Sequence, residues 1–298
     1  FWRIFNPTFF NPSTTTVAID IANAEGLIFL FMREFGTNFW NAFVSYLTPI
    51  IFAVLVFVVV VFAEGMHVNI PIAIGRAGFK SRFPVKFLYV SNIPVILAAA
   101  LFANIRLLST VLQGRVNAVP VIGEIINGGL GMLSTVVVPP SGLAQQFLTQ
   151  GLSPTVFGEI IQSITTLQFI GLGGSMLHGI LYIIILTLVA IVFGKFWVEM
   201  AGQGPEAISK QLENSGMFIP GFRRDPRIIR QVLDRYIPPI TIMGAAFVGL
   251  LAGFADLTGA LGSGTGILLT VGIVYRLYEE LAKAQLLETH PLLAKFLG

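Results

Sequence analysis

The chain has 298 residues, of which 55% are hydrophobic and 11% are charged, and its mean hydropathy is +0.82. Soluble domains carry about 25% charged residues, so this composition excludes an ordinary soluble fold. The net charge of +3 is too small for a nucleic-acid-binding face. The absence of cysteine excludes disulfides and thiolate metal sites within these residues.

The first ten residues, Phe1 to Phe10, have the composition of the end of an apolar helix. We therefore expect further residues before Phe1. Residues 1–39 are predicted to be the end of that preceding helix followed by an external loop. Residues 40–298 are predicted to form one transmembrane helical domain.

Trp40 to Ala63 is a run of 24 residues without a charge, more than the ~20 that cross a hydrocarbon layer of ~30 Å. Four further segments are of similar character. The sequence thus predicts an all-α membrane protein, a transmembrane helix bundle with five spans at residues 40–63, 87–112, 174–198, 236–254 and 261–281.

Basic residues predict the orientation, because Lys and Arg of short loops stay on the cytoplasmic side. They concentrate in the first and third loops between the spans, at Arg76, Lys80, Arg82, Lys86, Lys210, Arg223, Arg224, Arg227, Arg230 and Arg235. The residues between spans four and five include no basic side chain. We expect the amino end outside, and both basic loops and the carboxyl end in the cytoplasm of a multi-pass plasma-membrane protein.

Charged residues are missing from the middle of the predicted spans and occur near the ends, as Glu64, Lys195, Asp256 and Arg276. Ion-coupled carriers normally need ionisable groups within the membrane, which makes such a carrier an unfavoured alternative. HExxH, GxSxG and P-loop motifs are absent. We expect no catalytic residue, no cofactor and no metal.

Two local patterns have competing interpretations. His178 lies alone on a predicted helix, which favours a hydrogen-bonded histidine over a metal ligand. The glycine-rich run Gly259 to Gly266 superficially resembles a phosphate loop but lacks its Lys-Ser/Thr ending. We favour a tight helical hairpin there, because glycine permits positive φ.

The second span contains a proline and two amides. Pro94 should bend the helix, because it cannot donate to the carbonyl of residue 90. Asn92 and Asn104 each need a polar partner in the membrane. That partner could be a neighbouring helix, or the two residues could line a polar path or a seam that opens.

Several longer motifs carry a family resemblance. They are Lys86 to Ile105 (KFLYVSNIPVILAAALFANI), Pro220 to Arg223 (PGFR), Tyr236 to Pro239 (YIPP) and Gly259 to Val271 (GALGSGTGILLTV). With these motifs the chain resembles the archaeal SecY family, the channel subunit of the protein-conducting translocon. The resemblance implies a SecY-like half-channel whose five spans correspond to helices six to ten of the family.

By resemblance, Ile93, Ile96 and Leu269 match the aliphatic pore ring, and Asn104 matches a polar position of the lateral gate. A depth estimate agrees for the ring: Ile96 lies ten residues beyond Lys86, ~15 Å into the membrane. Such an apolar collar would exclude ions by dewetting while widening around a passing polypeptide.

The resemblance also implies partners. Arg76, Lys80, Arg82, Arg223 and Arg224 match cytoplasmic loops that receive the ribosome, where arginine can contact rRNA phosphates. SecE and Secβ are the expected small subunits, with signal sequences and nascent polypeptides as substrates beside the lipid bilayer. The expected function is passage of unfolded secretory chains and lateral release of apolar segments. A secondary small-solute transporter is the alternative, and an intramembrane enzyme or insertase-like chaperone is less favoured.

Overall fold

The structure is a computed structural model that describes residues 2–5, 8–11, 16–19, 26–74, 79–116, 129, 131–140, 142–151, 155–166, 169, 171–215, 217–218 and 226–289. The chain divides into two compact units. The first comprises Phe1–Val56, Pro139–Tyr182 and Phe254–Gly264, and the second comprises Phe57–Val138, Ile183–Gly253 and Thr265–Gly298. Each unit is described by itself.

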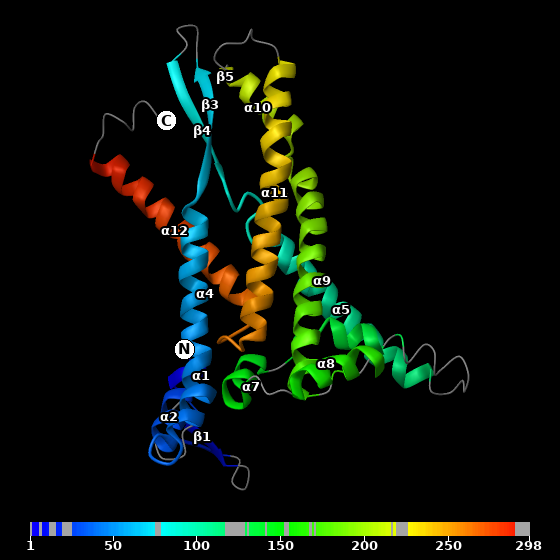
Figure 1. Cartoon of the computed structure of the whole chain (residues 1–298). Coiled ribbons are helices and arrows are strands. Elements are labelled where there is room, and N and C mark those ends of the chain that lie inside the picture. The colour runs from blue at the N-terminus through cyan, green and yellow to red at the C-terminus, as the bar shows by residue number, and fades with distance from the viewer. Residues whose placement is uncertain are drawn as a thin grey trace. The chain divides into compact units, whose positions relative to one another are not determined.

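Helices make up most of the described chain (Figure 1). Among the described residues, four helical segments are long and apolar enough to span a membrane: Phe39–Gly65, Ile93–Leu112, Gly171–Asn214 and Arg227–Leu257. These segments match four of the five predicted spans. The fifth predicted span falls on α12 (Gly264–Thr289), a helix of 26 residues, so the count of five stays a prediction.

The first unit contains short elements before and after its longer helices. They are α1 (Trp2–Phe5), β1 (Thr8–Asn11), β2 (Thr16–Ile19), α2 (Leu27–Glu34), α3 (Phe39–Ala42), the π-helical turn η1 (Phe43–Leu47), α7 (Leu143–Gln150) and α8 (Thr155–Thr166). Strands β1 and β2 pair as an antiparallel hairpin. The start of α4 (Thr48–Gly65), the start of α9 (Gly171–Met200) and the end of α11 (Pro226–Leu257) also belong to this unit.

The hairpin between α11 and α12 confirms the structural interpretation of the glycine-rich run. Gly259 and Gly262 have φ values of 64° and 97°, which only glycine adopts readily. The carboxylate of Asp256 accepts a 2.7 Å hydrogen bond from the N–H of Gly264 and a 2.8 Å bond from the hydroxyl of Tyr182. One carboxylate therefore satisfies a free N–H at the start of α12 and joins α9 to α11.

Replacing Asp256 with alanine should lower the free energy of unfolding by about 1–3 kcal/mol, because two donors in a partly buried site lose their acceptor. Thermal unfolding in detergent measures this loss. Tyr182→Phe removes only one of the two bonds and should cost about 1 kcal/mol. An Asp256→Ala variant that unfolds no earlier than Tyr182→Phe would show that the Gly264 contact contributes nothing.

The second unit contains a small sheet that hydropathy did not indicate. Strands β3 (His67–Ile74) and β4 (Phe79–Lys86) form an antiparallel hairpin, and β5 (Met217–Phe218) pairs with the end of β3. Alternating apolar residues at Val68, Ile70, Ile72 and Ile74 are the sequence signal for β3. The predicted all-α class thus describes the spans, while the first basic loop is a β-hairpin (Figure 1).

Helix α5 (Ile93–Val116) begins later than the predicted span at residue 87. Residues 87–92 form turns, and Ser91 has a φ of 55°. Pro94 is the second residue of α5, where the first helical turn needs no N–H from it. The predicted bend at Pro94 is therefore wrong, because the residue lies at the start of the helix.

Helix α11 (Pro226–Leu257) differs in the opposite sense. It begins ten residues before the predicted span at residue 236, and it contains Pro238 and Pro239 in its interior. The predicted span begins two residues before Pro238, whereas the helix begins at Pro226. Ile229, Leu233 and Ile237 on the preceding turns are buried in the core of the second unit, so burial of that face explains how the helix extends in front of the prolines.

Within the second unit, α9 and α11 run side by side (Figure 1). Small residues allow this close approach. A methyl group at Gly253 would lie 2.9 Å from Cγ1 of Ile183, and one at Gly194 would lie 2.9 Å from Cβ of Ala245. The core beside these helices is apolar and comprises Val85, Val90, Val198, Leu212, Ile229, Leu233, Ile237 and Ile240.

Candidate functional site

The three residues predicted for the pore ring lie on two helices of the second unit. Ile93 and Ile96 are on the first turn of α5, and Leu269 is on the second turn of α12. The side chains of Ile96 and Leu269 are 36% and 44% exposed, whereas the adjacent Val95 and Leu268 are buried. On each helix, one residue is thus buried and the next residue in the chain is exposed on the surface of the structure.

The starts of these two helices are joined by an amide. Asn92 is 4% exposed, and its Nδ2 donates a short hydrogen bond to the backbone carbonyl of Leu268. Asn92 directly precedes Ile93, and Leu268 directly precedes Leu269. The residues predicted for the pore ring on α5 and on α12 therefore lie next to one hydrogen bond between the two helices, and Asn92 is its donor.

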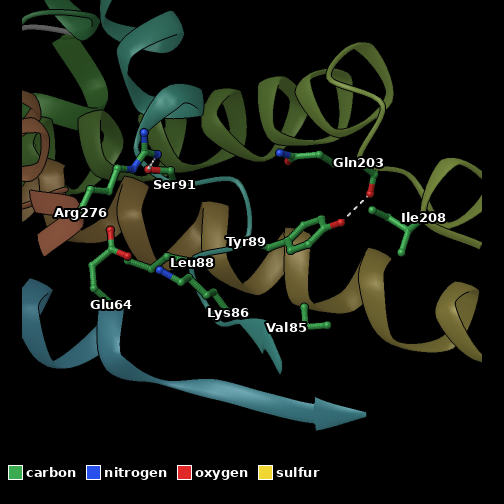
Figure 2. A pocket seen from close by; sticks show the side chains of 9 residues that line it. All are labelled: Glu64, Val85, Lys86, Leu88, Tyr89, Ser91, Gln203, Ile208 and Arg276. Atoms are coloured by element: carbon green, nitrogen blue, oxygen red, sulfur yellow. Dashed lines mark hydrogen bonds between the residues drawn. The ribbon is translucent and has the colours of Figure 1, made fainter. Parts of the chain in front are cut away.

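A pocket of about 300 Å³ lies beside this contact in the second unit (Figure 2). Its walls come from the end of α4, the end of β4, the turn before α5, the region after α9, and α12. The lining side chains are Glu64, Val85, Lys86, Leu88, Tyr89, Ser91, Gln203, Ile208 and Arg276. In Figure 2, Glu64, Lys86 and Arg276 gather at one end and Tyr89 points toward the other.

The charges around this pocket balance. Lys86 Nζ donates to both carboxylate oxygens of Glu279 at 2.7 and 2.8 Å, and it lies 5.3 Å from the centre of the Tyr275 ring. A guanidinium nitrogen of Arg276 donates to Ser91 Oγ at 3.2 Å. Glu64 is buried, with 7% exposure. The formal charges of these two acids and two bases cancel, so the cluster has no formal excess charge to attract an ionic substrate.

At the far end of the pocket the phenol of Tyr89 donates a 2.7 Å hydrogen bond to the carbonyl of Gln203. This bond links the turn before α5 to the loop after α9. Val85 and Ile208 supply apolar side chains at that end, next to Gln203 (Figure 2).

Sequence reasoning missed this charge cluster. Glu64 and Arg276 were seen only as charges near span ends, 212 positions apart in the chain. Glu279 was not singled out at all. The available signal was that Glu64, Lys86 and Arg276 each lie at the same expected side of the membrane, which permits but does not specify their pairing.

The remaining predicted site residues are dispersed. Asn104 is exposed on α5. Lys80 and Arg82 lie on β4, in register with Ala73 and Pro71 of β3. Arg76, Arg223 and Arg224 lie outside the described residues.

His178 lies in the first unit, and the prediction of no metal site concerns the described chain as a whole. The His178 ring is buried and stacks on Phe169 with ring centres 4.6 Å apart. Within the described ranges, His, Asp and Glu side chains form no group of three or more that could hold a metal ion. Stacking on an aromatic ring gives His178 a packing role on α9.

A sequence profile described as SecY matches residues 9–278. The chain belongs to the SecY family.

Curated relatives agree with this assignment. The chain is 44% identical over 284 residues to the protein translocase subunit SecY of Methanococcus vannielii, covering 95% of this chain and 59% of that protein. It is 40% identical over 285 residues to the protein translocase subunit SecY of Methanocaldococcus jannaschii, covering 95% of this chain and 58% of that protein. The chain therefore spans rather more than half the length of these relatives.

Two solved SecY-type structures resemble the fold. One, described as showing that the plug domain of SecY stabilises the closed state of the translocation channel, matches with a TM-score of 0.61 at 37% identity. It covers 92% of this chain and 57% of that chain. The other, described as a protein-conducting channel, matches with a TM-score of 0.58 at 37% identity. The match covers 92% of this chain and 58% of that chain. With its apolar helices, this SecY chain is a multi-pass membrane protein.

Proposed function

We propose that this SecY chain forms part of a protein-conducting channel of the Sec translocon. It passes unfolded secretory polypeptides across the membrane and releases apolar segments laterally into lipid. The observation that carries the proposal is the SecY match over residues 9–278, which includes every residue assigned here to the pore ring and the lateral gate. The channel performs no covalent chemistry.

The proposed seal is a collar made by Ile93, Ile96 and Leu269. Two observations support this proposal: Ile96 and Leu269 are exposed, and the two helices that carry them are joined by Asn92. An ion that enters a narrow apolar ring must lose its hydration water, and the ring has no polar groups to replace it. Side chains can rotate and separate, so the same ring widens when a polypeptide enters.

The proposed exit into lipid lies along α5, where Asn104 is exposed. An uncharged amide can exchange one hydrogen-bond partner for another at low cost. That property suits a seam which opens for a signal sequence and closes again. SecE and Secβ are the proposed small subunits of the assembly.

The direct test is translocation by reconstituted vesicles. The complete SecY channel that carries this sequence, assembled with its small subunits, should protect a secretory substrate from added protease. Coupled uptake of a small solute without protein translocation would instead support the carrier alternative. The curated relatives, named as translocase subunits, favour the channel over that alternative.

The proposed orientation places the carboxyl end and the two basic loops in the cytoplasm, where a ribosome would dock. Arg223→Glu should weaken ribosome binding about tenfold at low salt, because a guanidinium that contacts phosphate becomes a repelling carboxylate. Co-sedimentation of ribosomes with channel-containing vesicles measures the effect, and the difference should shrink as salt rises.

Arg106→Glu is the matched control for this test. Arg106 is an exposed arginine on α5 at the opposite predicted side of the membrane, so its reversal should leave ribosome binding unchanged. Equal binding by the wild type and Arg223→Glu would remove the docking role from this loop.

A further inference from the structure

The end of β4 and the turn before α5 contact α12 through three polar links, which come from residues 86, 91 and 92. Lys86 pairs with Glu279, Ser91 accepts from Arg276, and Asn92 donates to the carbonyl of Leu268. At 100° per residue, positions 268, 272, 276 and 279 of a helix lie on one face. These links therefore form a continuous seam along one stripe of α12.

The link through Asn92 differs from the other two because it is buried and lies at the level of the collar. Lys86 and Glu279 keep 44% and 30% of their side chains exposed, so solvent screens their attraction. Asn92 is 4% exposed. Its bond is therefore the one that water competes for least.

The backbone around the Asn92 bond is shaped to receive it. In a helix the carbonyl of residue 268 accepts from the N–H of residue 272, and a carbonyl oxygen has a second lone pair for another donor. A methyl group at Gly272 would lie 2.7 Å from Asn92 Nδ2. Glycine at this position leaves room for the amide to reach the carbonyl.

The oxygen of the same amide does not contribute to stability. Asn92 Oδ1 is buried and lacks a hydrogen-bond partner within the described structure. A buried acceptor without a partner is a cost, so the residue gains on Nδ2 and loses on Oδ1. Asparagine at this position is poorly explained by stability alone, which indicates a positional role.

We propose that Asn92 is a positioning residue of the collar, and that it sets the separation between Ile93 and Ile96 on α5 and Leu269 on α12. This inference rests on the proposed function. Gly272 supports the role by leaving the space in which the Asn92 amide sits. Asn92 itself does not line the passage.

The first test replaces Asn92 with leucine in the complete SecY channel. Leucine has the branching and the number of side-chain heavy atoms of asparagine, with larger methyl groups in place of the polar atoms, and it removes the bonded Nδ2 together with the unpaired Oδ1. Spin labels at Leu101 on α5 and Val274 on α12, both exposed, report the separation of the two helices. We expect a broader distance distribution and a rise of about fivefold in resting ion conductance, the population change expected when the single Asn92–Leu268 bond that links the two helices is lost.

Melting temperature is the readout that separates position from stability. It should change little in Asn92→Leu, because a gain and a loss are removed together. A large fall in melting temperature with an unchanged distance distribution would overturn the inference and make Asn92 an ordinary structural residue.

Gly272→Ala tests the same contact from the other helix. The added methyl should displace the amide and broaden the distance distribution, as Asn92→Leu does. In an Asn92→Ala background the Gly272→Ala change should add no further broadening, because the displaced group is gone. Ile273→Ala, an exposed neighbour on α12, is the control and should leave the distance unchanged.

The distance and conductance readouts also separate this inference from the proposed function. A broadened distance with unchanged conductance supports the positioning role of Asn92 and removes the collar assignment. An unchanged distance in Asn92→Leu overturns the positioning role, whatever the conductance does.

Discussion

Replacing both Ile96 and Leu269 with glycine should raise the resting ion conductance of the complete SecY channel by about tenfold or more. Each branched side chain contributes about 1.5–3 kcal/mol of apolar transfer free energy, and a barrier lowered by about 1.4 kcal/mol is crossed tenfold faster. Without these side chains the collar admits water, and ions keep their hydration. Single-channel recording in planar bilayers measures the conductance directly.

Two glycine variants control for the loss of helix propensity. Leu101→Gly and Val274→Gly introduce glycine at exposed positions on other faces of the same helices. We expect both to retain the low resting conductance. If the controls leak as much as the double variant, helix destabilisation and not the loss of a collar would explain the current.

Replacing Gly244 with valine should destabilise the second unit by about 3 kcal/mol, the upper part of the range for overpacking. A methyl group at Gly244 would lie 2.7 Å from the backbone carbonyl oxygen of Phe87. A backbone atom cannot turn aside as a flexible side chain does, so α11 or the turn before α5 must move. The Phe87 and Phe247 rings, whose centres are 5.6 Å apart, would separate with them.

The yield of monodisperse protein in detergent and its melting temperature report this change. Met243→Val is the matched control, because Met243 is the preceding residue of α11 and is 59% exposed. The control should melt like the wild type. A Gly244→Val variant of normal melting temperature would show that the close contact between α11 and Phe87 is not required.

Four spans and the glycine hairpin could be predicted from local sequence. A lipid-length run such as Trp40 to Ala63 indicates its own environment, because most of its residues are apolar and none is charged. Gly259 and Gly262 likewise indicate a turn through their own conformational freedom. Such features depend on neighbouring residues only, and the structure has long apolar helices at the four spans and a glycine turn at the hairpin.

Helix boundaries were less predictable from hydropathy. Phe87 to Asn92 is mostly apolar and was included in the second span, yet it forms turns and packs beside α11. Residues 226–235 are rich in arginine and were excluded from the fourth span, yet they extend α11 by burying Ile229 and Leu233. Hydropathy averages over a window and does not register which face of a short segment is buried.

The amino-acid sequence by itself determined that this chain is a membrane protein, where four long apolar helices lie, and, through its long motifs, the family to which it belongs. Only the tertiary structure decided that Asn92 bonds to the Leu268 carbonyl and that Lys86 pairs with Glu279, 193 positions away. The physical reason is that partition into lipid is a property of each residue and its neighbours. A hydrogen bond or ion pair, in contrast, exists only where folding brings a donor and an acceptor within about 3 Å.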